Sequence, residues 1–169
     1  MMNRFIVFLF IFYILFSQYI AAEKVVISRV GFQPAGSEEI DIYRAGGDDV
    51  GFGLKSSETV GRNIQKAVVV PDDHIVKTVK VYVIANSSKR IDITLACLDV
   101  KNNVLHYIAN KTISALGTGI QEIALDMLET NHVTNPNKYE YMFHLDFKDG
   151  GDDGNLMFYG AKIKLKEKG

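Results

Sequence analysis

Hydrophobic and polar residues alternate with a period of two through most of the chain after its first 22 residues. In the segment 79–85 the odd-numbered residues are three Val and one Ala, and the even-numbered ones are Lys, Tyr and Ile. In the segment 139–147 the odd-numbered residues are Tyr, Tyr, Phe, Leu and Phe, and the even-numbered ones are Glu, Met, His and Asp. Because successive side chains of a strand point to opposite faces, both segments are predicted to be half-buried β-strands.

Weaker patterns of the same kind predict further strands over 25–32, 40–43, 50–54, 63–70, 90–99, 104–110, 120–126 and 157–165. Turn residues separate several of them, at 86–89, 101–103 and 117–119. No sustained helical period follows residue 22. The fold expected is all-β, an antiparallel β-sandwich of a jelly-roll-like kind with about 8–10 strands. A barrel is the alternative. The sandwich is favoured because several strands carry apolar residues on both faces at one end.

The segment 157–165 is predicted to bury its odd-numbered residues, among them Met157 and Tyr159, and to point Phe158 outward. The outward face then carries Lys162, Lys164 and Lys166. Lysines on a strand commonly protect an exposed sheet edge from pairing with other chains. We therefore expect these lysines to protect an exposed edge against aggregation.

The first 22 residues have the pattern of a secretory signal peptide. Arg4 precedes an apolar run over 5–16, and small residues at Ala21 and Ala22 come before the charged Glu23. This predicts a signal peptide at 1–22 and one β-sandwich domain at 23–169, secreted or periplasmic. An uncleaved membrane anchor is the alternative, although the uninterrupted run is about half of the ~20 residues that a spanning helix needs.

Charge and cysteine content limit the partners. The chain has 19 basic and 20 acidic residues and no basic block, so no nucleic acid is expected as a partner, and no membrane after signal cleavage. The single Cys97 cannot form an internal disulfide and is expected to be a small buried hydrophobic residue. A nucleophile or an intermolecular bridge is the alternative. Asn86 and Asn110 lie in acceptor patterns for N-glycosylation.

A loop rich in side-chain oxygens follows the segment 139–147. Asp149, Asp152, Asp153 and Asn155 are candidate calcium ligands, since Ca²⁺ prefers six to eight oxygens from such loops. The spacing differs from that of the usual calcium loop, so a solvated hairpin turn is the alternative. The Gly-Gly-Asp-Asp sequence of 150–153 also occurs at 46–49. No other cofactor is expected.

Two further groups of residues are candidates for ligand binding. His144 and Asp146 share the outward face of their strand, roughly 7 Å apart, which suits a shared ligand better than a direct hydrogen bond. Tyr43, Tyr82 and Tyr107 are candidate exposed aromatics on which sugar rings could stack. For His144 and Asp146 the alternative is a polar face exposed to solvent. The absence of Trp weakens the sugar hypothesis for the tyrosines.

Enzyme signatures such as Gly-x-Ser-x-Gly, His-Glu-x-x-His and a phosphate-binding glycine loop are absent from the sequence. The expected function is therefore non-catalytic: a secreted module that binds a glycan or a protein surface through loops at one end of the sandwich. A structural or assembly protein, for which an oligomer is expected, is the alternative, and a small secreted hydrolase comes third. The predicted fold resembles the jelly-roll-like sandwiches that serve as attachment or accessory modules. This is an analogy of fold alone.

Overall fold

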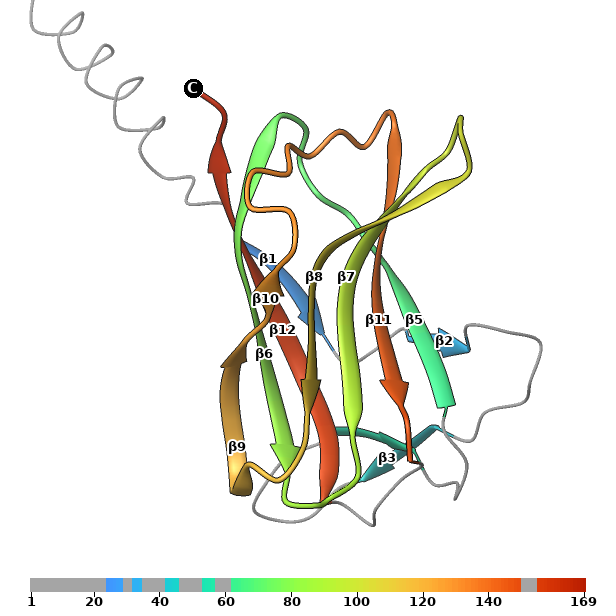
Figure 1. The fold of residues 1–169 in the computed structure, drawn as a ribbon, viewed down its shortest axis with the longest axis vertical. Helices are drawn as coiled ribbons and strands as arrows, with labels where there is room; N and C mark the ends of the chain where they lie inside the picture. The colour runs from blue at the N-terminus through green and yellow to red at the C-terminus, as the bar shows by residue number, and fades with distance from the viewer. Residues whose placement is uncertain (1–23, 29–31, 35–41, 46–52, 57–61, 150–154) are drawn as a thin grey trace, which may run out of the picture.

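Two antiparallel β-sheets of six strands each lie face to face (Figure 1). This computed structural model describes residues 24–28, 32–34, 42–45, 53–56, 62–149 and 155–169. The predicted signal peptide and the Gly-Gly-Asp-Asp sequences at 46–49 and 150–153 lie outside these ranges. The described residues contain no helix, and hence none long and apolar enough to cross a membrane.

Sheet A has the strand order β3-β4-β12-β6-β9, and β1 also pairs with β12. Its strands are β1 (Lys24–Ser28), β3 (Ile42–Ala45), β4 (Gly53–Ser56), β6 (His74–Ala85), β9 (Gly117–Ala124) and β12 (Leu156–Glu167). Sheet B has the order β10-β8-β7-β11-β5-β2. Its strands are β2 (Gln33–Pro34), β5 (Arg62–Val68), β7 (Ile91–Asp99), β8 (Val104–Ile113), β10 (Asp126–Met127) and β11 (Tyr139–Phe147).

The strand order confirms the predicted sandwich. The sets β1-β12-β6-β9 and β5-β11-β7-β8 have the arrangement of a jelly roll, in which the chain passes repeatedly from one sheet to the other. The structure has twelve strands in its described part, of which β2 and β10 have two residues each. The strand β11 begins and ends at the predicted residues, whereas β9 includes Gly117 and Gly119, which were predicted to form a break.

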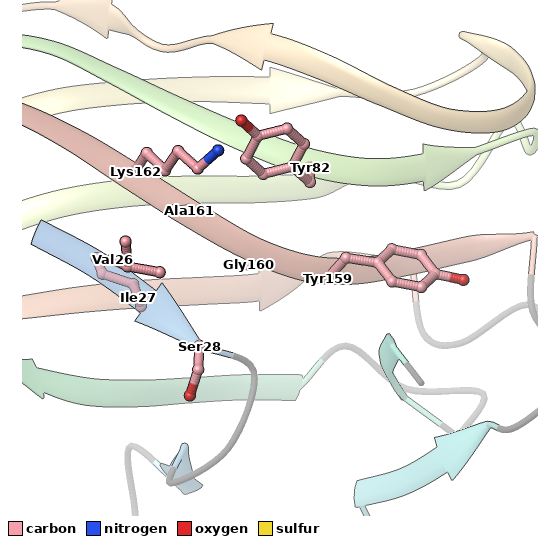
Figure 2. A pocket seen from close by; sticks show the side chains of 8 residues that line it. All are labelled: Val26, Ile27, Ser28, Tyr82, Tyr159, Gly160, Ala161 and Lys162. Carbon is pink, nitrogen blue, oxygen red and sulfur yellow. The ribbon is translucent and has the colours of Figure 1, made fainter. Parts of the chain in front are cut away.

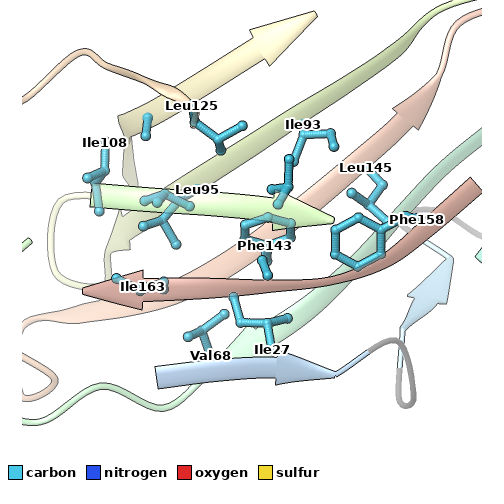
Figure 3. Close-up of a cluster of buried hydrophobic side chains, with 14 of the residues drawn as sticks. Ile27, Val68, Ile93, Leu95, Ile108, Leu125, Phe143, Leu145, Phe158 and Ile163 are labelled. Carbon is cyan, nitrogen blue, oxygen red and sulfur yellow. The ribbon is translucent and has the colours of Figure 1, made fainter. Parts of the chain in front are cut away.

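The core lies between the two sheets, where the alternating residues of both meet. Val79, Val81 and Val83 of β6 are fully buried, as their pattern predicted. They face the buried odd-numbered residues of β7 and β11. Figure 3 shows Phe143 and Phe158 within this cluster, and their ring centroids lie 5.7 Å apart. This burial of apolar surface is the main source of stability.

A β-bulge in β12 reverses the predicted faces at one end of the strand. The pairing with β6 shifts between Phe158 and Gly160, so Tyr159 is an extra residue that β6 does not oppose. Phe158 is consequently fully buried and Tyr159 is half-buried, and the prediction that Phe158 points outward is wrong. Gly160 has a φ of +152°, and a Cβ there would lie 2.9 Å from the Ile27 carbonyl oxygen. The bulge therefore needs glycine at this position.

The position of β12 also corrects the expectation that its lysines protect an exposed edge. Along Gly160–Lys164 it pairs with β1 on one side and with β6 on the other. Lys162 and Lys164 therefore lie on a central strand, where there is no open edge to protect.

Candidate functional site

A groove opens on the outer face of sheet A, where the bulge interrupts the regular surface. Its lining comes from β1, β6 and β12, and its volume is about 380 Å³. Figure 2 shows these residues: Val26, Ile27, Ser28, Tyr82, Tyr159, Gly160, Ala161 and Lys162. We call it the Tyr82 groove. This volume lies within the range of small-ligand sites.

The groove exists because residues of different size meet across the strands. Gly160 lies opposite Ser28 of β1 and opposite Tyr82 of β6. Paired residues point to the same face, so the Tyr82 ring stands beside a position that has no side chain. The bulge adds Tyr159 as a second aromatic residue, and Val26 contributes an exposed apolar surface. The local gap therefore follows directly from Gly160.

Charged side chains hold the Tyr82 ring in place. The Tyr82 hydroxyl donates to Glu122 Oε2 at 2.7 Å, and Lys80 Nζ lies 2.5 Å from Glu122 Oε1. The Lys162 ammonium lies 4.9 Å from the ring centroid of Tyr82, within cation–π distance. Hydrogen bonds from Lys80 and Tyr82 lower the pKa of Glu122, which stays ionised at neutral pH. Fixed aromatic and charged groups thus lie side by side.

The structure separates the predicted ligand-binding residues into two surfaces. Tyr82 lines the groove on sheet A, whereas Tyr107, His144 and Asp146 lie on the outer face of sheet B. The backbone of Tyr43 lies in β3, and its side chain is outside what the structure describes. Because the hydrophobic core separates the two faces, Tyr82 cannot share a small ligand with the other three residues.

The outer face of sheet B carries a polar network around Asp146. Lys148 Nζ forms ion pairs with Asp146 and Asp92, and Thr112 Oγ1 donates to Asp92 at 2.6 Å. The Asn63 amide, with its nitrogen turned toward Asp146, donates to that carboxylate at 2.9 Å. Asp146 is 9% exposed. Its oxygens are therefore engaged by neighbouring side chains rather than open to solvent.

His144 and Tyr107 differ from Asp146 in their surroundings. His144 is half-buried between Thr94 and Gln65 of the neighbouring strands, and burial lowers the pKa of its imidazole. Tyr107 is 55% exposed and lies opposite Ala96. Both side chains share the outer face of sheet B with Asp146, so the structure brings these three predicted residues to one surface.

The predicted calcium ligands are described only in part. Asp149 binds Arg90 through both carboxylate oxygens, with Nε–Oδ2 and Nη2–Oδ1 distances of 3.0 and 3.1 Å. Asn155 is exposed, and Asp152 and Asp153 lie outside the described residues. In the described ranges no three His, Cys, Asp or Glu side chains come together as a metal site. Calcium binding stays a prediction.

A buried polar cluster that sequence analysis missed joins the loop after β10 to sheet B. His132 is 4% exposed, and its Nδ1 lies 2.9 Å from Glu129 Oε2 while its Nε2 lies 3.0 Å from the Tyr141 hydroxyl. The Tyr141 oxygen also accepts the Asn135 backbone N–H at 2.9 Å. These residues lie within 13 positions of the chain, from Glu129 to Tyr141, but they share no motif, so only the folded chain reveals their contact.

Cys97 lies beside this cluster, with its Sγ 3.9 Å from His132 Nε2. A cysteine in contact with a histidine, which in turn contacts an acidic residue, also occurs in enzymes with a cysteine nucleophile. However, the thiol is fully buried, and burial raises the pKa of Cys97 to about 11. The thiolate needed for nucleophilic attack is therefore scarce at neutral pH. The arrangement supports packing, as expected from the sequence.

Replacing Tyr141 with Phe is expected to lower the free energy of unfolding by about 1–3 kcal/mol. The change leaves the His132 Nε2 and the Asn135 N–H without their buried partner. Urea denaturation measures the loss, and Tyr107→Phe, at an exposed tyrosine, is the matched control that should change nothing. An unchanged stability for Tyr141→Phe would show that water replaces the hydroxyl at no cost.

Comparison with known proteins gives structural neighbours but no sequence relatives. No family model matches the chain, and no curated protein matches it. One similar solved structure is the CBM36-1 domain of a multidomain xylanase from the hindgut metagenome of Trinervitermes trinervoides. It is 10% identical with a TM-score of 0.49, over 83% of this chain and 96% of that one.

Two other solved structures are similar in the same way. The xylan-binding module CBM15 is 8% identical with a TM-score of 0.47, over 86% of this chain and 98% of that one. CBM28, a module specific for non-crystalline cellulose, is 14% identical with a TM-score of 0.44, over 82% of this chain and 89% of that one. The class that the described residues define is an antiparallel β-sandwich with a groove on one outer face.

Proposed function

We propose that this protein is a non-catalytic binding module that acts outside the cytoplasm and holds a glycan in the Tyr82 groove. The observation that carries this proposal is the groove itself, in which two tyrosines lie beside charged hydrogen-bonding groups. The predicted signal peptide at 1–22 supports the location.

Sugars match this combination of groups. A pyranose ring presents apolar C–H groups on its faces and hydroxyl groups around its rim. Tyr82 and Tyr159 offer aromatic surface to the faces, and the Glu122 carboxylate and Lys162 ammonium offer an acceptor and a donor to the rim. Tyr82 is fixed by Glu122 before any ligand arrives, so little conformational freedom is lost on binding.

Catalysis is not part of the proposal. Glycoside hydrolysis needs a pair of carboxyl groups on either side of the scissile bond. Among the described residues that line the groove none is acidic, and Glu122 at its border is bound to Lys80 and Tyr82. A single carboxylate held in this way supports recognition of a sugar rather than its cleavage.

A glycan array with the purified protein tests the proposal. We expect retention on polysaccharides or oligosaccharides of one related group, and slower migration of the protein in native gels that contain the same glycan. Absence of binding to every glycan on an array of plant, microbial and animal structures, by a protein that unfolds cooperatively, would contradict the proposed function.

Assembly with another copy is a second candidate, favoured by the hairpin of β7 and β8. Val100, Val104, Leu105 and Tyr107 are 42–57% exposed on this hairpin, which extends from the sandwich at the upper right of Figure 1. The pairing register points Leu105 and Tyr107 to one face of the hairpin and Val104 to the other, so apolar side chains are exposed on both faces. Exposed apolar surface is one mark of an interaction site. If it joins two copies, the protein elutes as a dimer in size-exclusion chromatography, and Leu105→Asp restores the monomer. A monomeric parent protein would exclude this candidate.

A further inference from the structure

Five lysines gather on the outer face of sheet A around the Tyr82 groove. Lys24 lies on β1, Lys80 on β6, and three more follow on alternate positions of β12; all five are exposed. The three on β12 are Lys162, Lys164 and Lys166. We call this set the lysine patch. Lys162 belongs to the groove as well, so the patch and the groove form one continuous surface.

The pairing register places these like charges directly opposite one another. Lys24 pairs with Lys164, and Lys162 pairs with Lys80 in the next row of the same face. Neighbouring strands are about 4.8 Å apart, and like charges at this separation destabilise a sheet. In the second pair Glu122 lies beside Lys80 and offsets part of the repulsion, so the repulsion falls mainly on Lys24 and Lys164.

A single acidic residue neutralises the patch only in part. On the described parts of β1, β6, β9 and β12, Glu122 is the single acidic side chain of this face, and it pairs with Lys80. Over the ranges that the structure describes, Lys24, Lys162, Lys164 and Lys166 form no ion pair with a carboxylate. Protection of an edge does not explain Lys162 and Lys164 either, because β12 is a central strand there.

We propose that the ligand of the Tyr82 groove is an acidic glycan whose carboxylate or sulfate groups lie on the lysine patch; this inference rests on the proposed function. The chain as a whole has a net charge of −1, so the patch is a local feature rather than a consequence of a basic protein. An anionic polymer removes the repulsion between the paired lysines, while its sugar rings contact Tyr82 and Tyr159. Both parts of the surface then contribute to one ligand.

The test compares polymers that share a backbone and differ in charge. Polygalacturonate is compared with its methyl ester, and dextran sulfate with dextran, by isothermal titration calorimetry of the purified protein. We expect at least one acidic polymer to bind about tenfold tighter than its neutral form, since several exposed ion pairs of small individual strength act together. The acidic polymer that binds more tightly than its neutral form identifies carboxylate or sulfate as the preferred group. High salt should remove this difference in affinity because it screens exposed charges.

The variant Lys162→Gln/Lys164→Gln should lose the preference for the acidic polymer. Lys101→Gln/Lys111→Gln is the matched control, since both of its lysines belong to the sheet B side and the net charge changes equally. Equal affinity for the acidic and neutral forms, or a preference that survives in Lys162→Gln/Lys164→Gln, overturns the inference and leaves the proposed function standing. Absence of binding to any glycan on the array, by contrast, rejects both.

Discussion

Replacing Phe158 with Ala is expected to lower the free energy of unfolding by about 3–5 kcal/mol, the usual cost of removing a buried aromatic ring. The Phe158 ring is fully buried, and its centroid lies 5.5 Å from that of Phe32 and 5.7 Å from that of Phe143. Truncation leaves a cavity between the two sheets. Such a loss is a large part of the stability of an ordinary domain.

The neighbouring residue provides the control for this experiment. Tyr159 is half-buried on the groove side of the bulge, so Tyr159→Ala should cost about 1 kcal/mol or less. Urea denaturation of both variants compares the two positions directly. The simple alternation of the sequence predicts the opposite order, with Tyr159 in the core. A greater loss for Tyr159→Ala would therefore contradict the bulge.

Replacing Tyr82 with Ala is expected to weaken glycan binding by about 10- to 100-fold, the effect of removing a central aromatic contact. The Tyr82 ring forms one wall of the groove, and its hydroxyl orients Glu122. Tyr82→Phe keeps the ring and removes only the hydrogen bond, so its affinity should fall between those of the parent protein and Tyr82→Ala.

Tyr107→Ala is the matched control, since it removes an exposed tyrosine from the opposite sheet. Titration calorimetry with the glycan chosen by the array gives the three affinities. Stability must be measured beside them, to show that Tyr82→Ala remains folded. Full affinity in Tyr82→Ala together with a loss in Tyr107→Ala would place the ligand on sheet B instead.

Most strands could be predicted from the sequence because the alternation reflects burial between two sheets. The strand β11 is the clearest example, since its odd-numbered residues Tyr141, Phe143, Leu145 and Phe147 are all buried. In β12 the same reasoning failed at one point, because a bulge inserts a residue and shifts the period. Gly160 inside a strand was the available signal, since such glycines often mark bulges.

The candidate site was less predictable, because strand periodicity does not say which sheet a strand joins. Tyr82 and Tyr107 have similar patterns, yet the fold places them on opposite faces of the sandwich. Tyr159 was missed because its exposure depends on the bulge. The side chains of His132 and Tyr141 join a loop to a strand, and no local sequence pattern predicts this contact.

Mapping the bound glycan onto the protein by NMR tests the central claim most directly. The array selects the glycan, and titration with it should shift the amide signals of β12 and β6 around Gly160 and Tyr82, with smaller changes at Val26 of β1. The signals of Tyr107 and His144 on sheet B should stay unchanged. Shifts confined to β8 and β11, with none around Gly160, would contradict the assignment of the groove as the binding site.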